Sequence, residues 1–255
     1  MKINKGILFA SLAVGIGFAS CASHYSVSNV SRSRILIDKR YDVQPDEAAT
    51  KFLAPYKAKV DSQMSPVVGH TARYLQKYRP ESPLSNLLAD IMVWAGYKFN
   101  EHPVIGIYNM GGIRASLPAG NVTVGDVLDV APFENKISFL TLTGENLLKL
   151  FNEIAAVGGE AVSRGVQLEI THDGKLLSAR LNGKEIDPTA KYRIATIDYL
   201  AQGNDKLDAF KQKTNYVNPQ AKENDARFII TDYFIEMEKQ GVVVDAKVEG
   251  RIVVK

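Results

Sequence analysis

The stretch 104-VIGIYNMGGIR-114 decides what fold and what kind of site can be expected of this chain. Its first five residues are apolar and rich in isoleucine and valine, which predicts a short buried strand. The strand ends near Asn109, because the Gly111-Gly112 pair that follows breaks a regular element. Paired glycines also let the backbone approach a ligand closely, and Asn109 and Arg114 supply an amide and a guanidinium group there. A tight turn with a solvated arginine would have the same sequence, so both interpretations stay open.

Predicted helices and strands alternate on both sides of this stretch. Two helices have clear starts: Ser82 is an N-cap with Pro83 at the first helical position, and Thr143 caps the helix that follows an alternating strand. Helices are predicted at 45–64, 82–95, 143–154 and 225–240, and the other strands at 35–37, 137–142, 166–170, 176–181, 192–195 and 251–255.

Hairpin-like strand pairs occur among the strand–helix units, so the sheet is predicted to be mixed rather than purely parallel. No internal repeat and no long linker interrupts residues 35–255. We therefore predict that 35–255 form a single layered domain of the α/β class, with α+β character, in which helices pack on a mixed β-sheet.

Residues 1–20 have the pattern of a lipoprotein signal peptide. Two lysines precede an apolar run, which ends in Phe18-Ala19-Ser20 directly before Cys21. Small residues before a lone cysteine resemble the lipobox of bacterial lipoproteins. We expect Cys21 to be acylated after cleavage and residues 21–34, rich in serine and asparagine, to form a tether. The protein would then be exported and anchored by lipid in the bacterial cell envelope, on the periplasmic face or the outer surface. An ordinary signal peptide followed by a free or buried cysteine is the alternative.

The composition is that of an ordinary globular protein, with 45% hydrophobic and 23% charged residues. One cysteine excludes a disulfide framework and a cysteine-rich metal site. Two of the 31 basic residues leave with the leader, so 29 remain against 28 acidic ones. Without a basic run or a basic helix face, we expect no nucleic-acid partner.

The sequence contains no familiar pattern for breaking bonds. The four histidines (His24, His70, His102 and His172) are not at ligand spacing, and no H-E-x-x-H, P-loop or G-x-S-x-G motif occurs. We therefore expect no catalytic residue, no metal site and no cofactor in this chain.

Two more loops have unusual content. Phe133 lies in the loop 131–135 before a predicted strand, and the loop 196–205 places Tyr199 and Asp205 at a strand exit. A single loop phenylalanine is most often a plug of the core. Taken together, however, two aromatic rings can stack on both faces of a planar ring, an aspartate can accept from ribose hydroxyls, and an arginine can bind a phosphate. These are the groups that recognise a nucleoside.

Six motifs in a fixed order contain these residues. They are Glu81-Ser82-x-x-x-Asn86-Leu87-x-Ala89-Asp90, Asn109-x-Gly111-Gly112-Ile113-Arg114, Thr123-x-Gly125-Asp126-Val127, Pro132-Phe133-x-Asn135, Leu142-Thr143-Gly144 and Ala195-Thr196-x-Asp198-Tyr199-Leu200-Ala201. The series, which covers roughly 64–210, resembles the C-terminal domain of the 5′-nucleotidase / UDP-sugar hydrolase family.

The resemblance implies a domain that binds a nucleotide or nucleoside. By position, the loop with Asn109, Gly111, Gly112 and Arg114 would hold the substrate or its phosphate side. Phe133 and Tyr199 would sandwich the base, and Asp205 would bind the ribose.

The chain departs from the family pattern at three places near these residues. Tyr199 stands where phenylalanine is usual, and Gly203-Asn204-Asp205 replaces the family's Gly-Gly-Asp. Arg79 lies one residue away from the position at which some members have an arginine.

Full-length members of the family also have an N-terminal metallophosphoesterase domain, with Asp-x-His, Gly-Asn-His-Asp/Glu and Gly-His-x-His motifs that hold two metals. None of these motifs occurs in the 255 residues. The resemblance therefore implies the recognition half of a hydrolase of nucleotide catabolism, inactive until a separate metallophosphoesterase subunit supplies the divalent metals. Two alternatives are a non-enzymatic nucleoside-binding envelope lipoprotein and a structural lipoprotein that has lost the ligand.

Overall fold

The computed structural model describes residues 25–41, 43 and 45–255. The chain divides into two units, Met1–Phe52 and Leu53–Lys255. The described residues of the first unit are exposed and include the short 3-10 helix η1 (Lys39–Tyr41) and the start of helix α2 (Glu47–Met64). The expected signal peptide and Cys21 lie outside the described residues.

One prediction for the first unit is confirmed and one is wrong. Helix α2 covers nearly all of the predicted range 45–64. The strand expected at 35–37 does not form: Ile35 and Ile37 are 75% and 92% exposed and belong to no strand. Three apolar residues in a row do not make a strand without a partner for their backbone groups.

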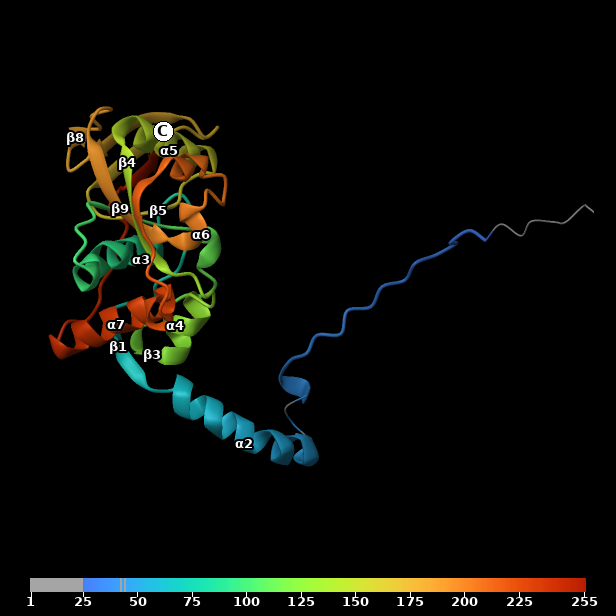
Figure 1. The fold of residues 1–255 in the computed structure, drawn as a ribbon. Coiled ribbons are helices and arrows are strands. Elements are labelled where there is room, and N and C mark those ends of the chain that lie inside the picture. Colours follow the sequence, from blue (N-terminus) through green and yellow to red (C-terminus); the bar gives the residue numbers. More distant parts are fainter. Residues whose placement is uncertain (1–24, 42, 44) are drawn as a thin grey trace, which may run out of the picture. The chain divides into compact units, whose positions relative to one another are not determined.

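The second unit holds the sheets and the other helices (Figure 1). Its strands are β1 (Val67–Thr71), β2 (Ile105–Tyr108), β3 (Gly120–Thr123), β4 (Ile137–Thr143), β5 (Ala161–Val162), β6 (Val166–Ile170), β7 (Leu176–Leu181), β8 (Lys184–Glu185), β9 (Lys191–Ile197), β10 (Thr214–Val217) and β11 (Ile252–Val254). Its helices are α3 (Pro83–Trp94), α4 (Val124–Val130), α5 (Gly144–Ala156), α6 (Asp198–Ala201) and α7 (Ala226–Lys239), with 3-10 turns η2 (Ala95–Phe99), η3 (Met110–Gly112), η4 (Asp208–Gln212) and η5 (Lys222–Asn224).

The α/β class with mixed sheets is confirmed, but the described strands divide among three sheets rather than one. The central sheet has the order β10-β4-β9-β2-β5, a second has the order β11-β6-β7-β8, and β1 pairs with β3. In the central sheet β2 is parallel to β9, and β9 is antiparallel to β4, which runs beside it in Figure 1. The β11–β6 pair is parallel and the rest of the second sheet is antiparallel.

Helices α3 and α5 start as their caps predict and pack on the central sheet. The Ser82 hydroxyl accepts from the Ser85 N–H at 3.2 Å, and the Thr143 hydroxyl accepts from the Asn146 N–H at 3.3 Å. Helix α3 packs on β2 and β9. It comes so close that a Cβ on Gly106 would lie 2.1 Å from the Ala89 carbonyl oxygen, so only glycine fits there.

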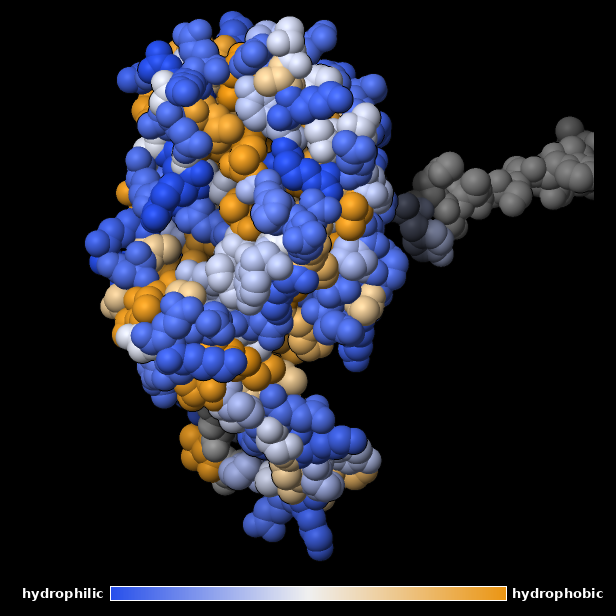
Figure 2. Space-filling view, turned by 60° about the vertical axis from the view of Figure 1, so that its left-hand side comes forward, coloured by the Kyte–Doolittle hydropathy of each residue, from blue (hydrophilic) through white to orange (hydrophobic). Residues whose placement is uncertain are grey.

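Apolar side chains fill the inside of this unit. Strand β2 is buried along its whole length, β4 up to its last residue, and β9 over its last four residues. On the face shown in Figure 2, hydrophilic side chains cover most of the surface and apolar ones form scattered patches. Within the described part of the chain, none of the helices is both long enough and apolar enough to cross a membrane.

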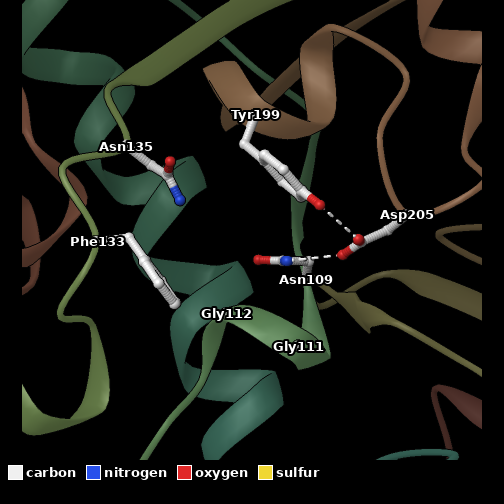
Figure 3. A pocket seen from close by; sticks show the side chains of 7 residues that line it. All are labelled: Asn109, Gly111, Gly112, Phe133, Asn135, Tyr199 and Asp205. Atoms are coloured by element: carbon white, nitrogen blue, oxygen red, sulfur yellow. Dashed lines mark hydrogen bonds between the residues drawn. The ribbon is translucent and has the colours of Figure 1, made fainter.

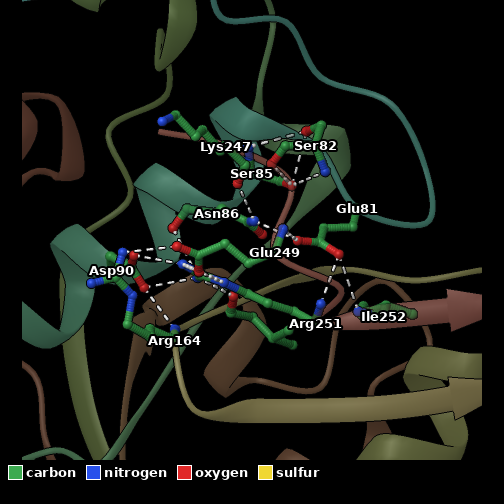
Figure 4. A network of polar contacts seen from close by, with 11 residues as sticks. Glu81, Ser82, Ser85, Asn86, Asp90, Arg164, Lys247, Glu249, Arg251 and Ile252 are labelled. Carbon is green, nitrogen blue, oxygen red and sulfur yellow. Dashed lines mark hydrogen bonds and ion pairs between the residues drawn. The ribbon is translucent and has the colours of Figure 1, made fainter. Parts of the chain in front are cut away.

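A network of polar contacts joins α3 to the closing strand β11 and the residues just before it (Figure 4). The Glu81 carboxylate accepts from the Asn86 amide at 2.6 Å and from the backbone N–H groups of Glu249 and Arg251, both at 2.7 Å. Arg251, which is 3% exposed, donates to both oxygens of Asp90 at 2.8 Å. The first sequence motif, Glu81 to Asp90, is therefore a structural device that holds the chain's end in place.

Candidate functional site

The order of the central sheet gathers three loops at one edge. Strands β2 and β9 are parallel neighbours, so the segments that follow them, beginning at Asn109 and Asp198, leave the sheet at the same edge. Strand β4 is antiparallel to β9 and pairs Ile137 with Ile197, so the loop before β4 reaches that edge too. The three segments singled out in the sequence are therefore neighbours in space.

These loops enclose a cavity of about 260 Å³. Its lining is Asn109, Gly111, Gly112, Phe133, Asn135, Tyr199 and Asp205. Figure 3 shows the rings of Phe133 and Tyr199 on opposite sides of this space, with the Asn135 amide beside them and Asn109 at its base. The two rings are 47% and 37% exposed, so each has a face open to a ligand. Asn135 belongs to the motif Pro132-Phe133-x-Asn135, but no pattern in the sequence marks it as a residue of the site.

The Asp205 carboxylate lies at one end of the cavity and is held by two side chains. The Asn109 amide nitrogen donates to one oxygen at 2.7 Å, and the Tyr199 hydroxyl donates to the other at 2.9 Å. The pKa of Tyr199 is raised, chiefly because its hydroxyl donates to this carboxylate. The bond from Asn109 joins two loops, and the bond from Tyr199 joins two residues of the segment that follows β9, so the end of the cavity has a defined shape.

Asn109 is nearly fully buried and has a free acceptor. Its amide nitrogen faces a carboxylate, which only accepts, so its side-chain oxygen points the other way. That oxygen is buried and has no hydrogen-bond partner within the described structure. Gly112 makes room for it, because a Cβ on this residue would lie 2.2 Å from the Asn109 oxygen. A buried acceptor without a partner is costly, and a ligand donor would satisfy it.

The Phe133 loop is fixed by the start of α7. The Ala226 N–H donates to the Asn135 carbonyl at 2.8 Å, and the Arg227 guanidinium donates to the Pro132 carbonyl at 3.2 Å and to the Glu134 carboxylate at 2.9 Å. The Phe133 ring is therefore not a plug of the core, since it stays half-exposed on a loop whose backbone is held.

Three cationic side chains surround the Gly111 loop on its other side. Arg114 is exposed and donates to the Gly111 carbonyl at 3.3 Å, but it does not line the cavity. Lys77 donates to the Met110 carbonyl at 2.9 Å and to the Ile113 carbonyl, and its pKa is lowered by burial and then by Arg114 and Arg79. Sequence reasoning missed Lys77, because a lysine in an irregular segment has no pattern that marks it.

Arg79 is paired with a buried acid. Its guanidinium donates to Glu160 at 2.6 Å, and the other Glu160 oxygen accepts from the Met110 N–H. Burial raises the pKa of the Glu160 carboxyl, against the opposing effects of these two bonds. The pair thus connects the segment before α3 to the loop that carries Asn109. A second hollow, lined by Lys77, Tyr78, Arg79, Met110 and Gly111, lies beside it and shares Gly111 with the cavity.

The structure therefore brings together six of the site residues named from the sequence, and it places Arg114 next to them but outside the lining. The departure at Asn204 is accommodated, since the Asn204 amide donates to the Tyr199 carbonyl at 2.8 Å. Among the described residues, no group of three or more histidine, cysteine, aspartate or glutamate side chains is arranged to hold a metal ion.

Comparisons with known proteins find relatives for most of the chain. The family model of the 5′-nucleotidase C-terminal domain matches residues 65–212. The chain is 27% identical over 181 residues to a 5′-nucleotidase of Vibrio cholerae, covering 69% of this chain and 32% of that protein. It is 29% identical over 236 residues to the trifunctional nucleotide phosphoesterase protein YfkN of Bacillus subtilis, covering 85% of this chain and 16% of that protein.

Among solved structures, the crystal structure of a 5′-nucleotidase precursor from Thermus thermophilus superposes with a TM-score of 0.71 at 27% identity. The match covers 84% of this chain and 44% of that one. This chain thus spans about a third of the length of the curated 5′-nucleotidases that it matches.

Proposed function

Because this chain belongs to the 5′-nucleotidase C-terminal domain family, we propose that it is the nucleotide- and nucleoside-recognition subunit of a 5′-nucleotidase-type phosphohydrolase. The observation that supports this function best is the cavity with Phe133 and Tyr199 on opposite sides and Asp205 at its end. An aromatic base stacks between the two rings, and each ring contributes on the order of 1–3 kcal/mol to binding.

The polar groups around the rings fit the rest of a nucleoside. The Asp205 carboxylate accepts hydrogen bonds only, which suits the hydroxyls of a ribose. The buried oxygen of Asn109 needs a donor, and the Asn135 amide can bond to a base edge. Stacking on two faces accepts any base, so this geometry favours nucleosides as a class.

The phosphate of a bound nucleotide lies away from Asp205, because two anionic groups repel each other. The cationic side chains beside the Gly111 loop are Lys77, Arg79 and Arg114, and Arg114 is exposed and makes one long hydrogen bond. Its guanidinium can turn to bind a phosphate, with Lys77 adding positive charge nearby.

Hydrolysis requires a metallophosphoesterase outside these 255 residues, since the sequence contains none of its three metal-ligand motifs. Divalent metals held there would activate water and stabilise the leaving oxygen. The half-exposed rings of Phe133 and Tyr199 leave the ligand open to such a partner. The signal-peptide pattern and Cys21 support export and lipid anchoring in the cell envelope, which would place both subunits outside the cytoplasm.

A reconstitution assay tests the proposal. The purified chain should bind AMP but not hydrolyse it with Mn²⁺ present. Adding a metallophosphoesterase subunit that has the two-metal motifs should start hydrolysis, and Asp205→Asn in the present chain should slow it. Metal-dependent hydrolysis of AMP by this chain alone would contradict the proposal. Binding of AMP without activity in the presence of that partner would instead identify a nucleoside-binding lipoprotein.

A further inference from the structure

The hydroxyl of Tyr199 has a role that base stacking does not require. Stacking uses only the face of the ring, yet this hydroxyl points at Asp205 and donates to it at 2.9 Å (Figure 3). Asn109 donates to the other carboxylate oxygen at 2.7 Å. Each oxygen of Asp205 therefore has one bond inside the protein, and the two donors fix the plane of the carboxylate.

The loop that carries Asp205 depends on these contacts. Gly203, Asp205 and Lys206 all have positive φ, at 86°, 55° and 64°. Aspartate and lysine adopt this region at a cost, so such a loop persists only where surrounding contacts hold it. The side-chain contacts that hold it include the bond from Asn204 to the Tyr199 carbonyl, at 2.8 Å, and the bonds that Asp205 accepts from the Tyr199 hydroxyl and the Asn109 amide. These bonds between Tyr199 of α6 and the following loop stabilise the conformation of both.

We infer that the Tyr199 hydroxyl is a positioning group that holds Asp205 ready for a vicinal diol, so that the site selects ligands with both ribose hydroxyls over deoxy ligands. The inference deepens the proposed function and rests on it. Tyr199 then serves two purposes: its ring face contacts the base, and its hydroxyl sets the sugar selectivity through Asp205.

The chemistry of a carboxylate explains the selectivity. A carboxylate has about four acceptor positions, two on each oxygen. The bonds from Asn109 and Tyr199 use one position on each oxygen and leave one on each. Two neighbouring hydroxyls can donate to these two positions together, whereas a sugar that lacks them leaves both unused. Because the carboxylate is already oriented, the ligand does not have to order it on binding.

Loss of the hydroxyl should therefore affect only ligands that use Asp205. Tyr199→Phe keeps the ring and its stacking face but removes the bond to Asp205. We expect it to weaken ribonucleoside binding about 3- to 10-fold, the effect of one net hydrogen bond. The affinity for 2′,3′-dideoxynucleosides and for free bases should stay within about twofold, because these ligands make no diol contact with Asp205.

The experiment is a calorimetric titration of the whole chain with adenosine, 2′,3′-dideoxyadenosine and adenine. Tyr199→Phe should lower the ratio of adenosine to dideoxyadenosine affinity, and Asn204→Ala should lower it in the same direction. The matched control is Tyr216→Phe, which removes the hydroxyl of another half-exposed tyrosine that does not line the cavity. It should leave all affinities unchanged.

Two results would overturn the inference. The ratio of the two affinities could be the same in Tyr199→Phe as in wild type, either because neither affinity changes or because both weaken equally; equal weakening would indicate a structural role for the hydroxyl. If wild type binds none of the ligands while folded, the proposed function fails and the inference fails with it. A melting temperature measured for each variant separates these results from unfolding.

Discussion

Replacing Gly112 with alanine should disable the cavity while leaving the fold in place. The new Cβ would lie 2.2 Å from the side-chain oxygen of Asn109 and 3.1 Å from its Cγ. Non-bonded heavy atoms in contact lie about 3.5–4 Å apart, so the Asn109 amide has to move by roughly 1 Å or more. Asn109 is 4% exposed and has little room to move within the core, so its bond to Asp205 is the contact that breaks.

The magnitude follows from that contact. A hydrogen bond to a charged group contributes about 1.5–3 kcal/mol, and crowding a packed site costs about 1–3 kcal/mol. We therefore expect Gly112→Ala to weaken adenosine binding about 10-fold or more, and to lower the free energy of unfolding by about 1–3 kcal/mol. Calorimetry measures the first quantity and urea denaturation the second.

Gly111→Ala is the matched control for this prediction. Its Cβ would lie 3.7 Å from the Asn109 nitrogen and 3.7 Å from the nearer Asp205 oxygen, which is ordinary contact. Binding by this variant should stay within about threefold of wild type. If the two alanine variants bind equally well, or if Gly112→Ala binds as wild type, the claim that Asn109 organises the site is refuted.

Three more predictions concern the rings, the closing strand and pH. Phe133→Ala should weaken nucleoside binding about 5- to 160-fold, because it removes about 1–3 kcal/mol of stacking. The control Tyr74→Ala removes an exposed ring outside the cavity and should not change the dissociation constant. Arg251→Ala should lower the free energy of unfolding, measured by urea denaturation, by about 2–4 kcal/mol. The loss is smaller than for a fully buried ion pair, because the Asp90 side chain is partly exposed to solvent. A loss too small to measure would show that the network does not stabilise the fold. Burial raises the pKa of Glu160 above its usual 4.5, so the folded state favours the protonated form. The stability of wild type relative to Glu160→Gln should therefore fall as pH rises from about 4.5 and level off above the raised pKa, and a rise over that range would contradict this assignment.

The sequence predicts helices and strands well where the interactions that form them lie within a few residues of one another. Ser82 and Thr143 cap helices with bonds to residues three positions ahead, so their pattern is visible in a short window. The buried strands β2, β4 and β9 are likewise predictable from their apolar runs. Helix α4 was missed, although Thr123 and Asp126 bond reciprocally at its start, because seven residues are too few for a helical period to show.

Contacts between distant residues could not be predicted. Glu81 binds the backbone of Arg251, which is 170 positions away, so nothing near Glu81 marks it as structural. Lys77 became part of the site only because the fold places it against the Met110 carbonyl. Six of the seven residues that line the cavity follow from the loop patterns and the resemblance, whereas Asn135 does not. The bond from Tyr199 to Asp205 depends on the turn of α6, which no sequence pattern reveals.

The central claim is that the cavity between Phe133 and Tyr199 holds a nucleoside, and titration of adenosine and AMP into the purified chain tests it most directly. We predict saturable binding at a single site, weakened by Phe133→Ala and by Asp205→Asn, with the folded state of both variants verified by their melting curves. If the folded wild-type chain binds neither ligand at millimolar concentration, or if both variants bind as wild type does, the claim is contradicted.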